Sequence, residues 1–121
     1  MDFQTILVNG GYMNKKVEQF RDIAEKRWEY LEKGDSKNGN KCFDELEKLI
    51  TEFKAENDLE SLIVLLEYPN DGVKLETASK LLPIYPVKSV QVLESLTTKR
   101  GILPFTAKQT LKQWKAGKMN R

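Results

Sequence analysis

Charged side chains at helical spacing are the residues of this 121-residue sequence whose types and positions could do chemistry. Five carboxylates recur every three or four residues between positions 14 and 33, namely Glu18, Asp22, Glu25, Glu29 and Glu32. On a helix they would form one acidic ridge, because residues three and four apart are neighbours on a helix surface. Such a ridge could mimic phosphates and block a basic, nuclease-like partner protein. The alternative is a solvent-exposed face whose carboxylates pair with cations of the same helix.

A second charged pattern lies near the C-terminus. Residues 1–89 carry a net charge of −4, whereas residues 90–121 carry +6. Lys108, Lys112 and Lys115 fall at i, i+4 and i+7 and predict one basic stripe on a helix. An anionic partner would fit this stripe, either a nucleic acid or an acidic protein surface. The alternative is a solvated helix whose cations complement its own dipole, and no aromatic platform accompanies the lysines in the pattern.

The residue types that most enzymes and metal sites need are missing or isolated. The sequence has no histidine and one cysteine, Cys42, so it lacks the commonest acid–base catalyst and any set of zinc ligands. It contains no glycine-rich phosphate loop and no nucleophile motif. We therefore expect a protein that is not an enzyme and that has no cofactor and no metal. We expect Cys42 to be a buried side chain, and Trp28 and Trp114 to belong to the core because both lie on apolar stripes.

Six helices can be predicted from apolar spacing and turn residues, at 14–33, 40–56, 59–68, about 71–82, 87–100 and about 104–116. Asn40 and Asp58 are expected to cap the second and third helices, and Asn70 or Asp71 the fourth. Gly101 is expected to end the fifth helix and Gly117 the sixth. The third helix is apolar nearly all round, which predicts that it is the central, most buried element.

These helices predict three antiparallel hairpins, 14–56, 58–85 and 87–116, stacked in a single all-α domain over residues 1–121. Short helices and tight turns favour a stacked array, in which three hairpins are about the minimum for a shared core. A closed helical bundle is the alternative. The first 13 residues precede the first helix and are expected to form a flexible N-terminal segment.

The stretch YPNDGVKLETASKLL resembles a HEAT-type repeat, in which a proline ends one helix, an Asp or Asn caps the next, and a valine and a basic residue open it. Those places are filled by Pro69, Asp71, Val73, Lys74, Ala78 and Leu82. From about residue 20 to 118, the chain resembles a small bacterial family, domain of unknown function family twenty-nineteen. It departs from the repeat at Thr77, where alanine is usual, and at Lys74, where arginine is usual.

The resemblance implies a HEAT-like α-α superhelix in a small cytoplasmic bacterial protein, and some relatives could serve as immunity partners of toxins. No apolar run approaches the roughly 20 residues that cross a bilayer, so no membrane partner is expected. We expect a non-enzymatic module that binds another protein, of the inhibitor or immunity type. The alternative function is weak nucleic-acid binding through the basic C-terminal helix.

Overall fold

The computed structural model describes residues 14–117, which contain six helices and no strand. The helices are α2 (Lys15–Glu32), α3 (Ser36–Ala55), η2 (Leu59–Glu67), α4 (Asp71–Leu81), α5 (Pro86–Ser95) and α6 (Ile102–Lys115). The predicted all-α class is therefore confirmed, whereas the expectation for the first 13 residues lies outside the described part of the chain. Within that part, no helix combines the length and the hydropathy that a membrane span needs.

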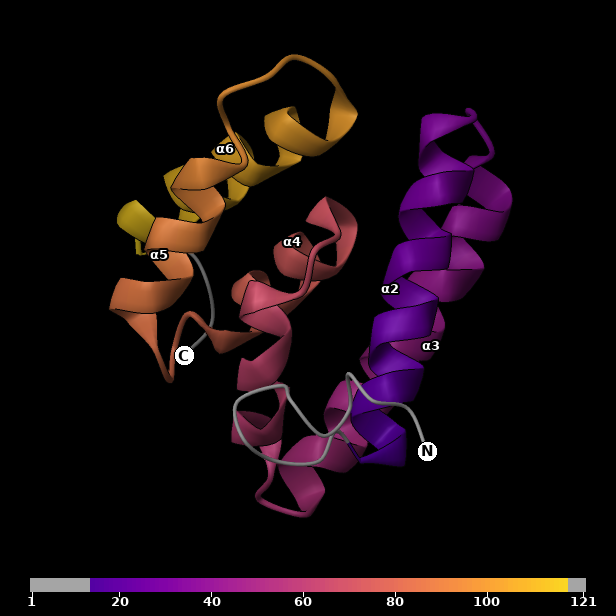
Figure 1. The fold of residues 1–121 in the computed structure, drawn as a ribbon, viewed down its shortest axis with the longest axis vertical. Helices are drawn as coiled ribbons and strands as arrows, with labels where there is room; N and C mark the ends of the chain where they lie inside the picture. Colours follow the sequence, from indigo (N-terminus) through magenta and orange to yellow (C-terminus); the bar gives the residue numbers. More distant parts are fainter. Residues whose placement is uncertain (1–13, 118–121) are drawn as a thin grey trace.

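Helix α4 is the hub of the structure. Helices α2 and α3 pack side by side, α5 and α6 lie on the opposite side, and α4 lies between the two pairs (Figure 1). Seven of the eleven residues of α4 are buried, against three of the nine in η2. The prediction that the third helical segment is the central element is therefore wrong. The reason is tertiary, since α4 has neighbours on several sides, namely α2, η2, α5 and α6.

Helix α3 begins four residues earlier than predicted. The Asp35 side chain accepts a hydrogen bond from the backbone N–H of Asn38 at 3.1 Å, so Asp35 rather than Asn40 caps this helix. Hydrogen bonds from the side chain and backbone of Asn38 also lower the pKa of Asp35. Gly39, expected in the break, is buried in the first turn, where a Cβ atom would lie 2.6 Å from Leu31 Cδ2. The glycine thus lets α3 approach α2 closely.

The third helical segment, η2, is a 3-10 helix and not the predicted α-helix. Its three-residue period places Leu62 and Leu65 on one face, and both are fully buried. The predicted cap at Asp58 is also wrong, because its side chain bonds no backbone N–H. The carboxylate instead accepts a hydrogen bond from the Ser61 hydroxyl at 2.6 Å.

The turn into α4 follows the sequence pattern closely. Asn70 accepts a hydrogen bond from the Val73 N–H at 3.0 Å, which confirms the predicted cap. Gly72 then lies against Trp28 of α2, and a Cβ atom at this glycine would lie 2.8 Å from Trp28 Cβ. The start of α4 therefore rests directly on α2.

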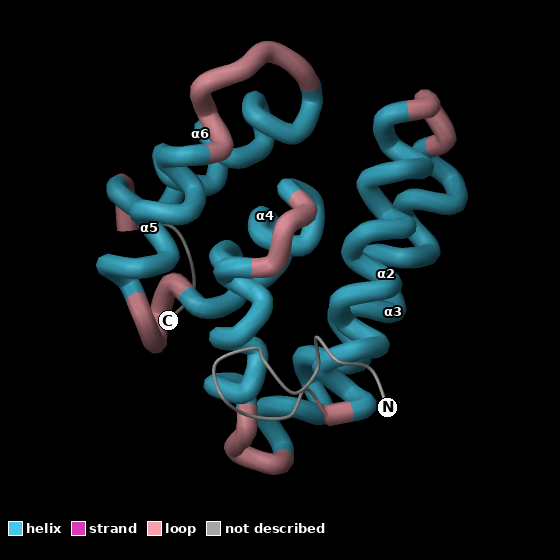
Figure 2. Tube along the Cα trace, in the orientation of Figure 1, coloured by secondary structure: helices cyan, strands magenta, loops and turns pink. Residues whose placement is uncertain are grey.

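Helix α5 ends at Ser95, five residues before the predicted end. The hydroxyl groups of Ser95 and Thr97 donate to the carbonyls of Val92 and Glu94, which is how such side chains compete with helix hydrogen bonds. Gly101 does not end α5 but immediately precedes α6, with φ 131°. Gly117, with φ 73°, follows α6 as predicted. Figure 2 shows that the α5–α6 loop lies at the same edge of the molecule as the α2–α3 turn.

Candidate functional site

The acidic ridge on α2 forms one row of carboxylates along the helix. Its five members are Glu18, Asp22, Glu25, Glu29 and Glu32. Asp22 is paired, because Arg21 Nε lies 2.8 Å from its Oδ1. Among residues 14–117, no ion pair involves the other four carboxylates. The ridge therefore keeps most of its negative charge for the solvent or for a partner.

Two cations of α2 make their ion pairs with other helices instead of with the ridge. Lys16 reaches α3, where its Nζ lies 3.3 Å from Glu52 and 2.6 Å from Glu56. Arg27 pairs with Glu76 of α4. These contacts join α2 to its neighbours, and they direct two cations of the helix away from the ridge.

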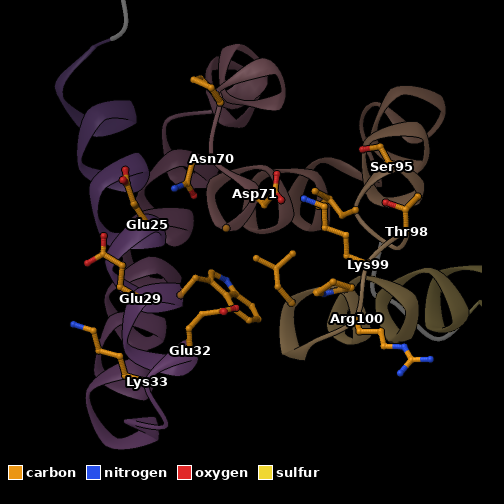
Figure 3. A pocket seen from close by; sticks show the side chains of 16 residues that line it. Glu25, Glu29, Glu32, Lys33, Asn70, Asp71, Ser95, Thr98, Lys99 and Arg100 are labelled. Carbon is orange, nitrogen blue, oxygen red and sulfur yellow. The ribbon is translucent and has the colours of Figure 1, made fainter.

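A cleft of about 740 Å³ lies beside the C-terminal half of the ridge. One wall is α2, including Glu25, Glu29 and Glu32; the second is residues 69–72 at the start of α4; the third is the α5–α6 loop with the start of α6. Figure 3 shows these three segments around the cleft. The predicted ridge is thus one rim of a cavity that sequence analysis did not anticipate.

The floor of the cleft is apolar and its rim is charged. Trp28, Leu96 and Leu103 contribute to the lining, and each is at least nine-tenths buried. Charged lining residues come from all three walls, and they are Glu25, Glu29, Glu32, Lys33, Asp71, Lys99 and Arg100. An apolar floor with a few charged groups around it is the usual composition of a binding site.

Trp28 is held from behind by a buried carboxylate. Its indole N–H donates to Glu76 Oε2 at 2.8 Å, and Arg27 pairs with the same oxygen. Glu76 is 6% exposed, so this is a buried charged group with two donors. Sequence analysis did not identify this buried glutamate. Glu76 lies three residues after Val73, and this spacing places it at the edge of the inner face of α4. The predictions that Trp28 and Cys42 are buried are both confirmed.

The basic stripe lies on α6, beyond the part of that helix that borders the cleft. Lys108, Lys112 and Lys115 are exposed, and no ion pair among residues 14–117 involves them. Phe105 is 59% exposed and lies three residues before Lys108, on the same side of the helix. The stripe thus has the aromatic neighbour that sequence analysis did not recognise. The structure does not bring the stripe and the ridge into one site.

A family model described as "Domain of unknown function (DUF2019)" matches residues 14–114. The chain belongs to the DUF2019 family. The family match covers the six described helices except the last residue of α6, and it covers all three walls of the cleft. A search of curated proteins finds no match for this chain.

One solved structure shares the fold of this DUF2019 chain. It is the crystal structure of the protein RPA1889 from Rhodopseudomonas palustris CGA009, with a TM-score of 0.82 and 24% sequence identity. The similarity covers 90% of this chain and 93% of that one. At this identity the likeness establishes the fold alone.

The described residues also limit the chemistry of the site. Between positions 14 and 117, no group of three or more His, Cys, Asp or Glu side chains could hold a metal ion. Burial raises the pKa of the Cys42 thiol, which keeps this thiol protonated and poorly nucleophilic. The charged features that the described residues form are the ridge, the adjoining cleft and the separate stripe.

Proposed function

We propose that this DUF2019 chain is a non-enzymatic protein-binding module of the inhibitor or immunity type, which masks a basic surface of another protein. One observation carries the proposal, namely that four of the five ridge carboxylates lack an ion-pair partner among the described residues. Like charges three and four residues apart destabilise a helix by a few tenths of a kcal/mol per pair. A cationic partner surface would relieve that repulsion and gain from charge complementarity.

The spacing of the ridge suits a partner that handles phosphates. Side chains three or four residues apart on a helix are about 5–6 Å apart at Cβ, so the ridge presents a regular row of anions. A surface that binds successive phosphates is lined with lysines and arginines, and it would accept such a row in place of its nucleic acid. An inhibitor with this ridge would occupy the nucleic-acid-binding face of a nuclease-like protein.

Two further features belong to the proposal. We take the succession of helices to be a HEAT-like α-α superhelix, supported by the packing of α2 on α3, η2 on α4 and α5 on α6. We place the encounter in the bacterial cytoplasm, because the one cysteine is buried and unpaired, as is common in a reducing compartment.

The test is capture of partners from a lysate of the native host, followed by measurement with the purified partner. The immobilised full chain should retain one stoichiometric basic protein after nuclease treatment and in moderate salt. A variant with Glu18, Glu25, Glu29 and Glu32 all changed to Gln should lose it. A matched variant with Lys108, Lys112 and Lys115 changed to Gln should keep it. Retention by the first variant, or loss by the second alone, would refute the ridge as the binding surface.

A second candidate function is weak nucleic-acid binding by α6, and the exposed Phe105 beside the lysines favours it. An exposed aromatic ring can stack on a base while neighbouring lysines hold phosphates. Three phosphate contacts to a single strand predict a log–log salt dependence with a slope of about −2. Fluorescence anisotropy with a labelled single-stranded oligonucleotide would measure it. Binding that survives Lys108→Glu, Lys112→Glu and Lys115→Glu together would exclude the stripe.

A further inference from the structure

We propose that the cleft between α2, the start of α4 and the α5–α6 loop is a docking site for one segment of the partner protein, carrying an arginine or lysine next to an apolar side chain. This inference rests on the proposed function, because it specifies which segment of the basic partner enters the cleft beside the ridge. The ridge by itself would attract any basic surface. The cleft adds a shape and an apolar contact, and it would therefore give the interaction its specificity.

The cleft is preformed by contacts that do not depend on a ligand. Its volume of about 740 Å³ falls within the roughly 300–1,000 Å³ of typical ligand sites. Trp28 is fixed on one side by Gly72 and on another by its hydrogen bond to Glu76. Leu96 and Leu103 are packed into the core cluster. A segment that enters therefore meets a rigid apolar floor, which reduces the entropy lost on binding.

The charges at the cleft favour a cation over an anion. In Figure 3, Glu29 and Lys33 extend away from the cleft, and so does Arg100. The same view shows Lys99 extending toward Asp71, and because these two lining residues carry opposite charges they add nothing to the net charge of the cleft. In this view Glu32 extends from α2 toward the cleft, whereas Glu25 extends along α2 at its edge. Among residues 14–117 neither carboxylate has an ion-pair partner.

The surroundings of these carboxylates favour a peptide segment over an isolated small cation. Glu25 and Glu32 belong to the ridge as well as to the cleft, so a protein that covers the ridge also covers the mouth of the cleft. The apolar floor would add the burial of an aliphatic side chain, at about 25 cal/mol per Å². A basic residue with an apolar neighbour satisfies both parts of the site at once.

The experiment selects short random peptides displayed on phage against the immobilised full chain, and then measures the selected peptides by fluorescence anisotropy. We expect the selected sequences to share a Lys or Arg adjacent to an aliphatic residue. Glu32→Gln should weaken their binding by about tenfold, the scale of one charge-assisted hydrogen bond. The matched control Glu45→Gln removes the same charge from an exposed residue of α3 that lies outside both the ridge and the cleft, and it should change binding by less than about twofold.

Lys99→Gln tests independently whether the charge of the ligand is positive or negative. It removes the cation that offsets Asp71, so binding of a basic peptide should stay the same or become tighter. Four results would each overturn the docking site. They are selection of acidic peptides, failure to select any peptide, equal effects of Glu32→Gln and Glu45→Gln, and weaker binding by Lys99→Gln.

The outcome also separates this inference from the proposed function. A captured partner whose affinity depends on Glu18 and Glu29, but not on Glu32, would keep the masking function and remove the docking site. Peptides that bind through Glu32, with no host protein held through the ridge, would keep the docking site and remove the masking function.

Discussion

Replacing Glu76 by alanine should be one of the most destabilising single changes in this protein. The carboxylate is 6% exposed and accepts from both the Trp28 indole and the Arg27 guanidinium. Its removal leaves an indole N–H buried without an acceptor. It also leaves a guanidinium whose side chain is 17% exposed without its counter-charge.

The magnitude follows from those two losses. Breaking one side of a buried ion pair costs about 3–5 kcal/mol, and a buried donor left without an acceptor costs about 1–3 kcal/mol. The two terms overlap, because both donors share one oxygen. Arg27 also keeps the faces of Phe43 and Trp28, whose ring centroids lie 5.0 Å and 5.2 Å from its Cζ. We therefore expect a loss of about 3 kcal/mol, a large part of the 5–15 kcal/mol that stabilises a typical domain.

Urea unfolding followed by circular dichroism measures this loss as a change in midpoint at constant m-value. The matched control is Glu67→Ala, which breaks the ion pair with Lys88 at the surface, where both side chains are about half exposed. That exposed pair should contribute less than about 1 kcal/mol. Glu76→Gln should fall between the two, because it keeps an acceptor for Trp28 while removing the charge. Equal losses for Glu76→Ala and Glu67→Ala would refute the argument that burial makes this carboxylate important.

Four further predictions concern packing and titration. Gly72→Ala should lower the unfolding free energy by about 1–3 kcal/mol, because the new Cβ atom would overlap Trp28. The higher helix propensity of alanine would offset about 1 kcal/mol of that loss. An unchanged melting temperature would show that α4 does not rest on Trp28. Leu66→Ala should cost about 2–5 kcal/mol, because this leucine is 2% exposed; a loss below 1 kcal/mol in urea unfolding would mean that η2 is peripheral. Thr77→Ala should raise stability by up to about 1 kcal/mol, since the buried hydroxyl has no hydrogen-bond partner among residues 14–117; a loss of stability in the same assay would reveal a partner. Burial raises the pKa of Cys42, so stability should fall as pH rises above the free-thiol value of about 8.5, and native-state alkylation should be slow below that pH; equal alkylation rates for the folded and the urea-unfolded chain would contradict this.

Local signals made much of the fold predictable. The regular apolar spacing in α2 predicted its limits to within one residue, and Pro69 with Asn70 predicted the start of α4. These signals act within one turn of the chain, where capping and ring geometry decide the conformation. Gly117 was predicted for the same reason.

The errors occurred where contacts distant in sequence decide the structure. Gly39 is a helix-weakening residue, yet α3 includes it because α2 approaches closely at that position. Helix α4 is the central element because other helices surround it, and no pattern within residues 71–81 indicates those neighbours. The cleft combines residues from three segments, 25–33, 69–72 and 95–104, which lie 36 and 23 positions apart in the sequence, so its floor could not be predicted without the packing.

Two glutamates near the same tryptophan divide stability from recognition. Glu76 lies behind Trp28, is buried and holds the indole, so its loss should loosen the core and the floor of the cleft together. Glu32 lines the cleft, is exposed and has no ion pair among residues 14–117, so its charge can change without a change in packing. A variant that unfolds the protein therefore says little about binding, whereas Glu32→Gln at unchanged stability isolates the charge that a partner would meet. This separation is what makes the proposed docking site testable in a protein of this size.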